Sequence, residues 1–311
     1  MTSNDRDLYD VLVVGGGPAG LSAALYLARY DRRVALFDAG HGRSTWSQVN
    51  HNYLGFPGGV STRTLRELGR RQLEEYPQVS VFERKVEAMA WAEGLFEACG
   101  QAGVWRGRAV ILCPGVIDHW PHVEGWSHYV GRSLFWCLTC DGYGCRGVRT
   151  VVAGNTDNAA QEALQLSRFT DRITVLTDSH DHEIGAAMRG RLAWAGIELV
   201  EDRIKSVEGD EDKGQLRAIW THDGRCIELD QLFSLHGATP ATGLAPDLGV
   251  ALTPDGYIAV DEEQRTGVPG VFAAGDATRL HSHQVSTAVH EGGQAASSAN
   301  FYLYPPELRG E

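Results

Sequence analysis

A glycine-rich turn between an apolar run and a helical pattern is the strongest constraint on how this chain can fold. Residues 11–14 are all apolar and predict a buried parallel strand. The motif Gly15-x-Gly17-x-x-Gly20 follows directly, and the next ten residues, LSAALYLARY, have helical periodicity. A second apolar strand then ends at Asp38. This order of strand, turn, helix, strand and acid predicts a dinucleotide-binding unit.

Each residue type in this turn has a physical reason to be there. Gly15 permits the tight turn, Gly17 lets the backbone approach a pyrophosphate, and Gly20 lets the helix pack closely on the strand. The helix start supplies free N–H groups for the phosphates. Asp38 is placed to accept hydrogen bonds from a ribose. A glycine turn with a purely structural role is the alternative, and the complete strand, helix and acid context disfavours it.

The middle of the chain repeats the same pattern. We expect a strand at 148–153, a helix at 158–168 and a strand at 173–176, then a strand at 270–273 that leads through Gly275 and Asp276 into a helix at 284–304. This order predicts an α/β fold with two Rossmann-like, three-layer dinucleotide-binding domains, the second inserted in the first. The expected boundaries are 1–117 and 244–311 for the first domain and 118–243 for the second.

Three further segments connect these units. A turn-rich loop begins at Asn52 and precedes a predicted helix at 62–75. Alternating segments between 79 and 110 suggest an antiparallel excursion. The stretch from Pro121 to Gly131 is punctuated by two glycines and is interpreted as a linker.

Composition excludes several classes of function. The net charge of −12 argues against a nucleic-acid partner, because phosphate binding needs clustered Lys and Arg. No apolar stretch approaches the length of a membrane span, so no membrane partner is expected. The N-terminal residues lack the basic and apolar layout of a signal peptide. The expected location is therefore the cytosol.

The cysteines point to redox chemistry. Cys137 and Cys140 have the Cys-x-x-Cys spacing, in which a cysteine at or near a helix start acquires a lowered thiol pKa. The thiolate is the attacking species in disulfide exchange, and Asp141 could deliver or remove the proton. Half of a zinc site is the alternative, but no second closely spaced Cys or His pair accompanies it. The other four cysteines are expected to be buried small apolar side chains: Cys99, Cys113, Cys145 and Cys226.

Taken together, these motifs resemble the low-molecular-weight thioredoxin reductase family. The resemblance runs the length of the chain and rests on GGGPAG at 15–20, CxxCDG at 137–142, GxxP at 237–240 and GVFAAGDA at 270–277. It implies a homodimer with one FAD per subunit, in which an inserted NADPH-like domain carries the redox cysteines. It also implies catalytic roles for Cys137, Cys140 and Asp141.

The resemblance also carries over a set of FAD contacts. Val86 would contact the adenine through its backbone, Asp276 the ribityl chain, and Gln284 the pyrimidine edge of the flavin. Cys113, Pro114 and Gly115 stand where the family usually has Ala-Thr-Gly, which would leave a cysteine, Cys113, close to the cofactor. The implied cofactor-binding residues are Gly15, Gly17, Pro18, Ala19, Gly20, Asp38, Asn52, Val86, Gly115, Gly275, Asp276, Gln284 and Val285.

The nicotinamide site departs from the family pattern. In the inserted domain, Thr156 stands where the GxGxxA motif of the family has its second glycine. The Cβ of Thr156 would push the dinucleotide away. The stretch after the next strand contains Asp178 and no arginine for the 2′-phosphate of NADPH, a loss on the order of 4 kcal/mol for one close charge pair. Arg189 or Arg191 could restore binding. The sequence favours loss of NADPH binding.

The predicted function is therefore FAD-dependent disulfide exchange in which electrons pass to a thioredoxin-like protein or a small disulfide. The chain resembles branches in which ferredoxin or a second flavin is the electron donor. The alternatives are a conventional NADPH-dependent thioredoxin reductase, an oxygen-dependent dithiol oxidase, and a redox-responsive binding module. The dithiol oxidases carry CxxCH, whereas this chain has CxxCD.

Two groups of residues near these motifs have open roles. Five aromatic residues either pack the core and interfaces or form a stacking platform for a second flavin or an apolar substrate: Trp120, Trp126, Phe135, Trp136 and Tyr143. His281 and His283 either donate protons at the flavin or serve as ordinary surface or packing residues.

Overall fold

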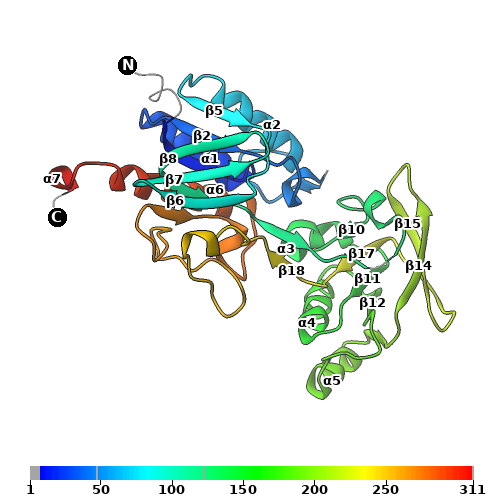
Figure 1. Cartoon of the computed structure of the whole chain (residues 1–311). Coiled ribbons are helices and arrows are strands. Elements are labelled where there is room, and N and C mark those ends of the chain that lie inside the picture. The colour runs from blue at the N-terminus through cyan, green and yellow to red at the C-terminus, as the bar shows by residue number, and fades with distance from the viewer. Residues whose placement is uncertain (1–7, 47, 122, 310–311) are drawn as a thin grey trace. The chain divides into compact units, whose positions relative to one another are not determined.

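The structure is a computed structural model that describes residues 8–46, 48–121 and 123–309. Within these residues the chain divides into two compact units (Figure 1). Unit 1 comprises Met1–Thr45, Arg63–Ile117 and Thr239–Glu311, and unit 2 comprises Trp46–Thr62 and Asp118–Ala238. The sequence prediction placed the second domain at 118–243. It did not anticipate that residues 46–62 belong to unit 2.

Unit 1 contains a sheet of seven strands among the described residues. Its central strand β8 is long enough to pair with β1 along one edge and, in succession, with antiparallel β7 and parallel β19 along the other. The buried apolar strands pair in parallel, as continuous apolar runs predict. The strands are β1 (Leu8–Val14), β2 (Val34–Phe37), β5 (Val79–Phe82), β6 (Ala88–Ala92), β7 (Leu95–Gly100), β8 (Gly103–Leu112) and β19 (Val271–Ala273).

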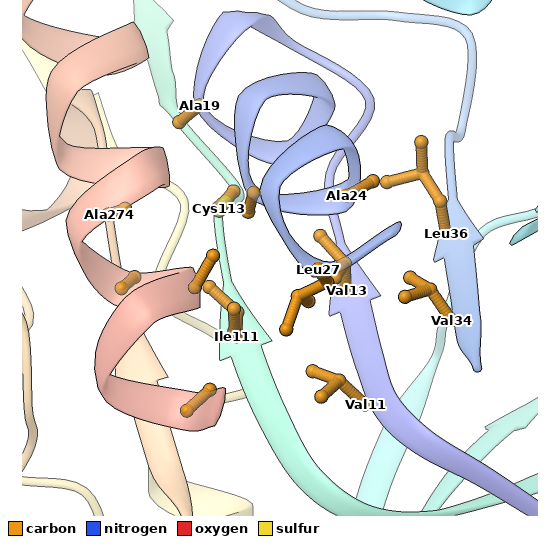
Figure 2. Packing of buried hydrophobic residues seen from close by; sticks show 14 of the residues in the cluster. Val11, Val13, Ala19, Ala24, Leu27, Val34, Leu36, Ile111, Cys113 and Ala274 are labelled. Carbon is orange, nitrogen blue, oxygen red and sulfur yellow. The ribbon is translucent and has the colours of Figure 1, made fainter. Parts of the chain in front are cut away.

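Two helices cover one face of this sheet, α1 (Pro18–Arg29) and α6 (Val285–Tyr302). Figure 2 shows Leu27 of α1 next to Val13 of β1 and Ala24 of α1 toward Leu36 of β2, with Ile111 of β8 on the side toward α6. Residues 244–260 and parts of β6 and β7 form a second buried cluster on the other face. Unit 1 is therefore a three-layer dinucleotide-binding domain, as predicted.

Unit 2 contains a parallel sheet of five strands among the described residues, ordered β10-β17-β11-β12-β13. Helices α4 (Asp157–Leu166) and α5 (Ala186–Trp194) contribute to the cluster on one face, and an antiparallel three-stranded sheet contributes to the cluster on the other. The strands are β10 (Leu134–Phe135), β11 (Thr150–Ala153), β12 (Ile173–Leu176), β13 (Glu198–Val200), β14 (Ile204–Asp210), β15 (Gln215–Thr221), β16 (Cys226–Glu228) and β17 (Gln231–Ser234).

The segment interpreted as a linker, from Pro121 to Gly131, is instead part of the core of unit 2. Val123, Tyr129 and Val130 are buried there, and Tyr129 is only 2% exposed. The glycines made the segment look like a connection because they form turns, while the apolar residues between them pack inward.

The remaining elements are short, apart from α2. They are β3 (Val49–Asn50), β4 (Val60–Ser61), α2 (Thr62–Leu73), β9 (Val116–Asp118), α3 (Leu138–Asp141), β18 (Ala238–Pro240) and α7 (Pro306–Arg309). Strands β9 and β18 pair where the chain passes between the units. Among the helices that the structure describes, none combines the length and apolar character that a membrane crossing requires.

Two glycines inside helices offer a matched test of the packing between α1 and α6. A Cβ at Gly292 of α6 would lie 2.1 Å from the carbonyl oxygen of Ala19, whereas a Cβ at Gly190 of α5 would meet no described heavy atom within 4 Å. We expect Gly292→Ala to lower the free energy of unfolding by about 2 kcal/mol because the helices must move apart. Gly190→Ala should raise it by up to about 1 kcal/mol, because alanine is the better helix former. Urea denaturation of both variants tests this, and equal effects would contradict it.

Candidate active site

The glycine turn of unit 1 leaves one open position at the start of α1. A Cβ at Gly15 would lie 2.0 Å from the carbonyl oxygen of Cys113, and one at Gly20 would lie 1.8 Å from that of Gly15. At Gly17 the nearest described heavy atom is Ser44 Oγ, at 3.5 Å. Gly15 and Gly20 are therefore needed for backbone packing, while the space at Gly17 fits the approach of a pyrophosphate. The turn suits the FAD that the sequence predicts.

A second turn of unit 1 is held by a buried carboxylate. Glu291 Oε2 accepts the backbone N–H of Gly275 at 2.8 Å, and Glu291 also pairs with Arg279. Burial is the main reason that the pKa of Glu291 is raised. Asp276, the next residue, forms an ion pair of 2.8 Å with Arg43. This turn precedes Gln284, which caps the start of α6.

The Asp38 carboxylate accepts more hydrogen bonds within the protein than the sequence indicated. Its Oδ2 accepts hydrogen bonds from Arg66 and Arg70 at 2.5 Å each, and its Oδ1 accepts the N–H of Gly40 at 2.9 Å. Burial alone would raise the pKa of Asp38, but the Gly40 hydrogen bond and the two guanidinium groups lower it. Sequence reasoning missed both arginines. Their spacing of four residues on a predicted helix was the available signal.

The predicted FAD contacts are divided between the units. Among the residues that the structure describes, all of them lie in unit 1 except Asn52. Asn52 lies in unit 2, where its Nδ2 is 4.0 Å from Cys140 Sγ. The assignment of these residues to FAD binding stays a prediction, and for Asn52 the structure adds a neighbour in the redox pair.

Cys137 and Cys140 form a disulfide in unit 2. Cys137 caps α3, and its Sγ accepts the backbone N–H of Cys140 at 3.1 Å. Both cysteines are partly exposed. A hydrogen bond of this kind stabilises negative charge on the acceptor sulfur, which favours a thiolate at Cys137 once the bond is reduced.

Asp141 follows this pair and is buried. Its Oδ2 accepts a hydrogen bond of 2.6 Å from Nε2 of Gln48, a residue that the sequence reasoning did not single out. Burial raises the pKa of Asp141 to about 7, and the hydrogen bond from Gln48 opposes part of this rise. A carboxyl group with this pKa can both give and take a proton near neutral pH.

The other cysteines are only partly as predicted. Cys113 and Cys145 are buried, but Cys99 is half-buried and Cys226 is exposed, so the expectation of burial was wrong for these two. Burial raises the pKa of the Cys113 thiol to about 12 and that of Cys145 to about 11. These two buried thiols are therefore protonated at neutral pH and poor nucleophiles.

The turn that begins α4 is in contact with the loop between β12 and α5. The N–H of Glu183 donates to the carbonyl oxygen of Asn155 at 2.7 Å, and the N–H of Gly185 donates to Oδ1 of Asp157 at 2.8 Å. Thr156 caps the helix without a capping hydrogen bond from its side chain. The loop and the Asp157 carboxylate thus lie at the helix end where a pyrophosphate would bind.

Asp178 and Arg189, two of the charged residues weighed for binding the 2′-phosphate, both have other partners, whereas Arg191, the second arginine that could restore binding, is exposed. Asp178 accepts hydrogen bonds from the N–H of Ile204 at 2.7 Å and from His236 Nε2 at 3.0 Å. Arg189, which could have restored binding, pairs with Glu201 and donates to the carbonyl oxygen of Ile184. Within the described residues, Arg189 is therefore not free to bind a phosphate.

The aromatic residues near the disulfide mostly pack together. The rings of Trp120 and Trp126 stack with centroids 4.8 Å apart, and Trp136 meets Trp120 edge-on. Trp46, from the segment that the sequence had not assigned to this unit, contacts both stacked rings. Tyr143 is 71% exposed and its ring lies against the Arg146 guanidinium instead. Core packing accounts for the tryptophans, and a second flavin stays a prediction.

The raised pKa of Asp141 makes folding stability depend on pH. The folded state binds the proton more tightly than the unfolded state, so the contribution is complete below about pH 4 and is lost as pH rises through about 7. The loss amounts to as much as about 4 kcal/mol. We expect Asp141→Asn to remove this slope, as measured by urea denaturation at about pH 5 and about pH 8. Parallel pH dependences of wild type and variant would contradict it.

Comparison with known proteins identifies the family. The model for "Pyridine nucleotide-disulphide oxidoreductase" matches residues 9–292. Thioredoxin reductase of Treponema pallidum is 32% identical over 307 residues, covering 95% of this chain and 97% of that protein. Among solved structures, thioredoxin reductase from Streptococcus pyogenes has a TM-score of 0.87 at 26% identity, covering 96% and 98% of the two chains. The atypical thioredoxin reductase TRi from Desulfovibrio vulgaris Hildenborough has a TM-score of 0.53 at 32% identity, covering 94% and 97%. The predicted fold and enzyme class are confirmed, and the chain belongs to the pyridine nucleotide-disulphide oxidoreductase family as a flavin-dependent disulfide oxidoreductase of the thioredoxin reductase type.

Proposed function

We propose that this enzyme passes electrons between FAD and the Cys137–Cys140 pair and on to a thioredoxin-like protein or small disulfide, without drawing them from NADPH. The observation that carries the proposal is the contact between the β12–α5 loop and the start of α4, where Glu183 binds Asn155 and Gly185 binds Asp157. A homodimer, which the resemblance implies, is part of the proposal. The electron donor would be a ferredoxin or a second flavin.

The charges around this loop support the same proposal. Thr156 stands where the family has glycine, and the carboxylate of Asp157 lies in the first helical turn, where it would repel a pyrophosphate. Arg189 already pairs with Glu201. Most relatives are named thioredoxin reductase, which fits the conventional alternative at least as well. One solved relative is described as atypical.

The residues of this chain would act in a simple sequence. Gly15, Gly17 and Gly20 would hold FAD, which when bound supplies and accepts electron pairs. Breaking the Cys137–Cys140 bond takes up two electrons and one proton, and it leaves one thiolate and one thiol. The N–H of Cys140 would favour charge on Cys137 Sγ, and Asp141 would supply a proton. The exposed thiolate would then attack the disulfide of the partner.

Adding a methyl group at Gly17 tests whether the glycine turn at the start of α1 binds FAD. The backbone there has φ −81° and ψ −174°, which alanine also adopts, and its Cβ would meet no atom closer than Ser44 Oγ at 3.5 Å. Gly17→Ala should therefore leave the stability of the FAD-free protein unchanged and weaken FAD binding about tenfold or more, roughly 1.4 kcal/mol. Calorimetric titration of both FAD-free proteins measures this. Undiminished affinity in a folded variant would remove Gly17 from the site.

The electron supply is tested by an anaerobic absorbance titration of the purified holoenzyme. We expect dithiothreitol to bleach the flavin and NADPH to leave it oxidised. The double variant Cys137→Ser and Cys140→Ser is the control, because it should lose the rapid bleaching by dithiothreitol. Prompt bleaching of the wild type by NADPH would overturn the NADPH-independent proposal and identify a conventional reductase.

A further inference from the structure

The amide side chain of Gln48 and the carboxyl side chain of Asp141 are buried against each other, and Asp141 directly follows the redox cysteine Cys140 in the sequence. Gln48 is 5% exposed and Asp141 is 9% exposed, and the amide Nε2 lies 2.6 Å from the carboxylate Oδ2. The two residues are far apart in the sequence and both belong to unit 2. Among the described residues, the side-chain hydrogen bond to the Asp141 carboxylate comes from the Gln48 amide.

The position of Gln48 is fixed by its own backbone contacts. A Cβ at Gly131, which has φ +71°, would lie 2.7 Å from the backbone nitrogen of Gln48 and 2.8 Å from its Cα. The carbonyl oxygen of Gln48 accepts the N–H of Thr62 at 3.3 Å. Gly131 therefore has to be glycine for this segment to pack here, and the backbone of Gln48 is fixed while its terminal amide can still rotate.

We propose that Gln48 is a positioning residue that governs when Asp141 holds and releases the proton exchanged with the Cys137–Cys140 pair. The inference rests on the proposed exchange of electrons between flavin and this pair. Reduction of the disulfide breaks the S–S bond with two electrons from the flavin and one proton from Asp141, and it leaves a thiolate at Cys137 and a thiol at Cys140. The Cys137 thiolate then attacks the partner disulfide and releases one partner thiolate. Cys140 returns its proton to the Asp141 carboxylate as it attacks the mixed disulfide, and the second partner thiolate leaves; both partner thiolates take up protons from water.

An amide suits this position because it can bind either form of the carboxyl group. Its N–H donates to the carboxylate, and after a half-turn its carbonyl oxygen accepts from the protonated acid. A cation would hold Asp141 ionised, and an apolar side chain would hold it protonated. Among the described residues, the Cys145 thiol is a further titratable group near Asp141; its Sγ lies 4.0 Å from the Asp141 backbone carbonyl oxygen, and it stays protonated at neutral pH.

The matched variants are Gln48→Met and Gln231→Met. Methionine preserves chain length and removes the amide, and Gln231 is a second amide near the site, bonded to Cys145 Sγ at 2.8 Å and not to Asp141. The rate at which dithiothreitol reduces the flavin of the holoenzyme is measured anaerobically against pH. The ionisation belonging to Asp141 is the one that Asp141→Asn abolishes. We expect Gln48→Met to raise the pH at which Asp141 ionises by about one to two units, and Gln231→Met to leave that pH unchanged.

Infrared titration of the Asp141 carboxyl band in the same proteins reads protonation without turnover. It separates the proposed function from the role of Gln48. If dithiothreitol failed to reduce the flavin, the proposed function would be wrong, but the infrared test of Gln48 could still be made. An unmoved band in Gln48→Met, or an equal shift in Gln231→Met, would overturn the inference. If Gln48→Met does not fold, Gln48→Glu serves instead. Repulsion between two adjacent carboxylates should also raise the pKa of Asp141, and an unchanged pKa would again overturn the inference.

Discussion

Unit 1 depends on the close approach of α1 to its neighbours. The helix begins against the carbonyl oxygen of Gly15, and further along, the Ala19 carbonyl lies against Gly292 of α6, with no room for a side chain at Gly20 or Gly292. Buried dispersion contacts hold this arrangement only if the backbones stay in contact. The open position at Gly17 exists because the residues on either side of it are fixed in this way.

Two aspartates illustrate how the same residue type takes opposite roles. Asp38 is surrounded by the Arg66 and Arg70 guanidinium groups, so its charge is stabilised and it stays ionised. Asp141 is buried beside a neutral amide, so its charge is stabilised only weakly. The first arrangement suits a permanent anchor, and the second suits a group that must change its protonation state.

The sequence was most informative where a feature lies within a few consecutive residues. Strands at 34–37 and 173–176 were predicted with the bounds that the structure has, because apolar runs and glycine turns are local signals. The Cys137–Cys140 pair was found for the same reason. Gln48 was missed because its role depends on a contact with a residue far along the chain. Residues 121–131 were misread because glycines marked their turns and concealed the burial of Tyr129 and Val130.

The pairing of α1 with α6 also has a consequence for how the chain is made. During synthesis α1 emerges early, whereas α6 emerges only after every residue of unit 2 has been translated. Unit 2 can therefore fold on the ribosome while the apolar face of α1 still lacks its partner. Unit 1 is therefore the last unit to complete its fold, although its first residues are the first to be translated. Until α6 is made, the apolar face of α1 is without its helical cover on the nascent polypeptide.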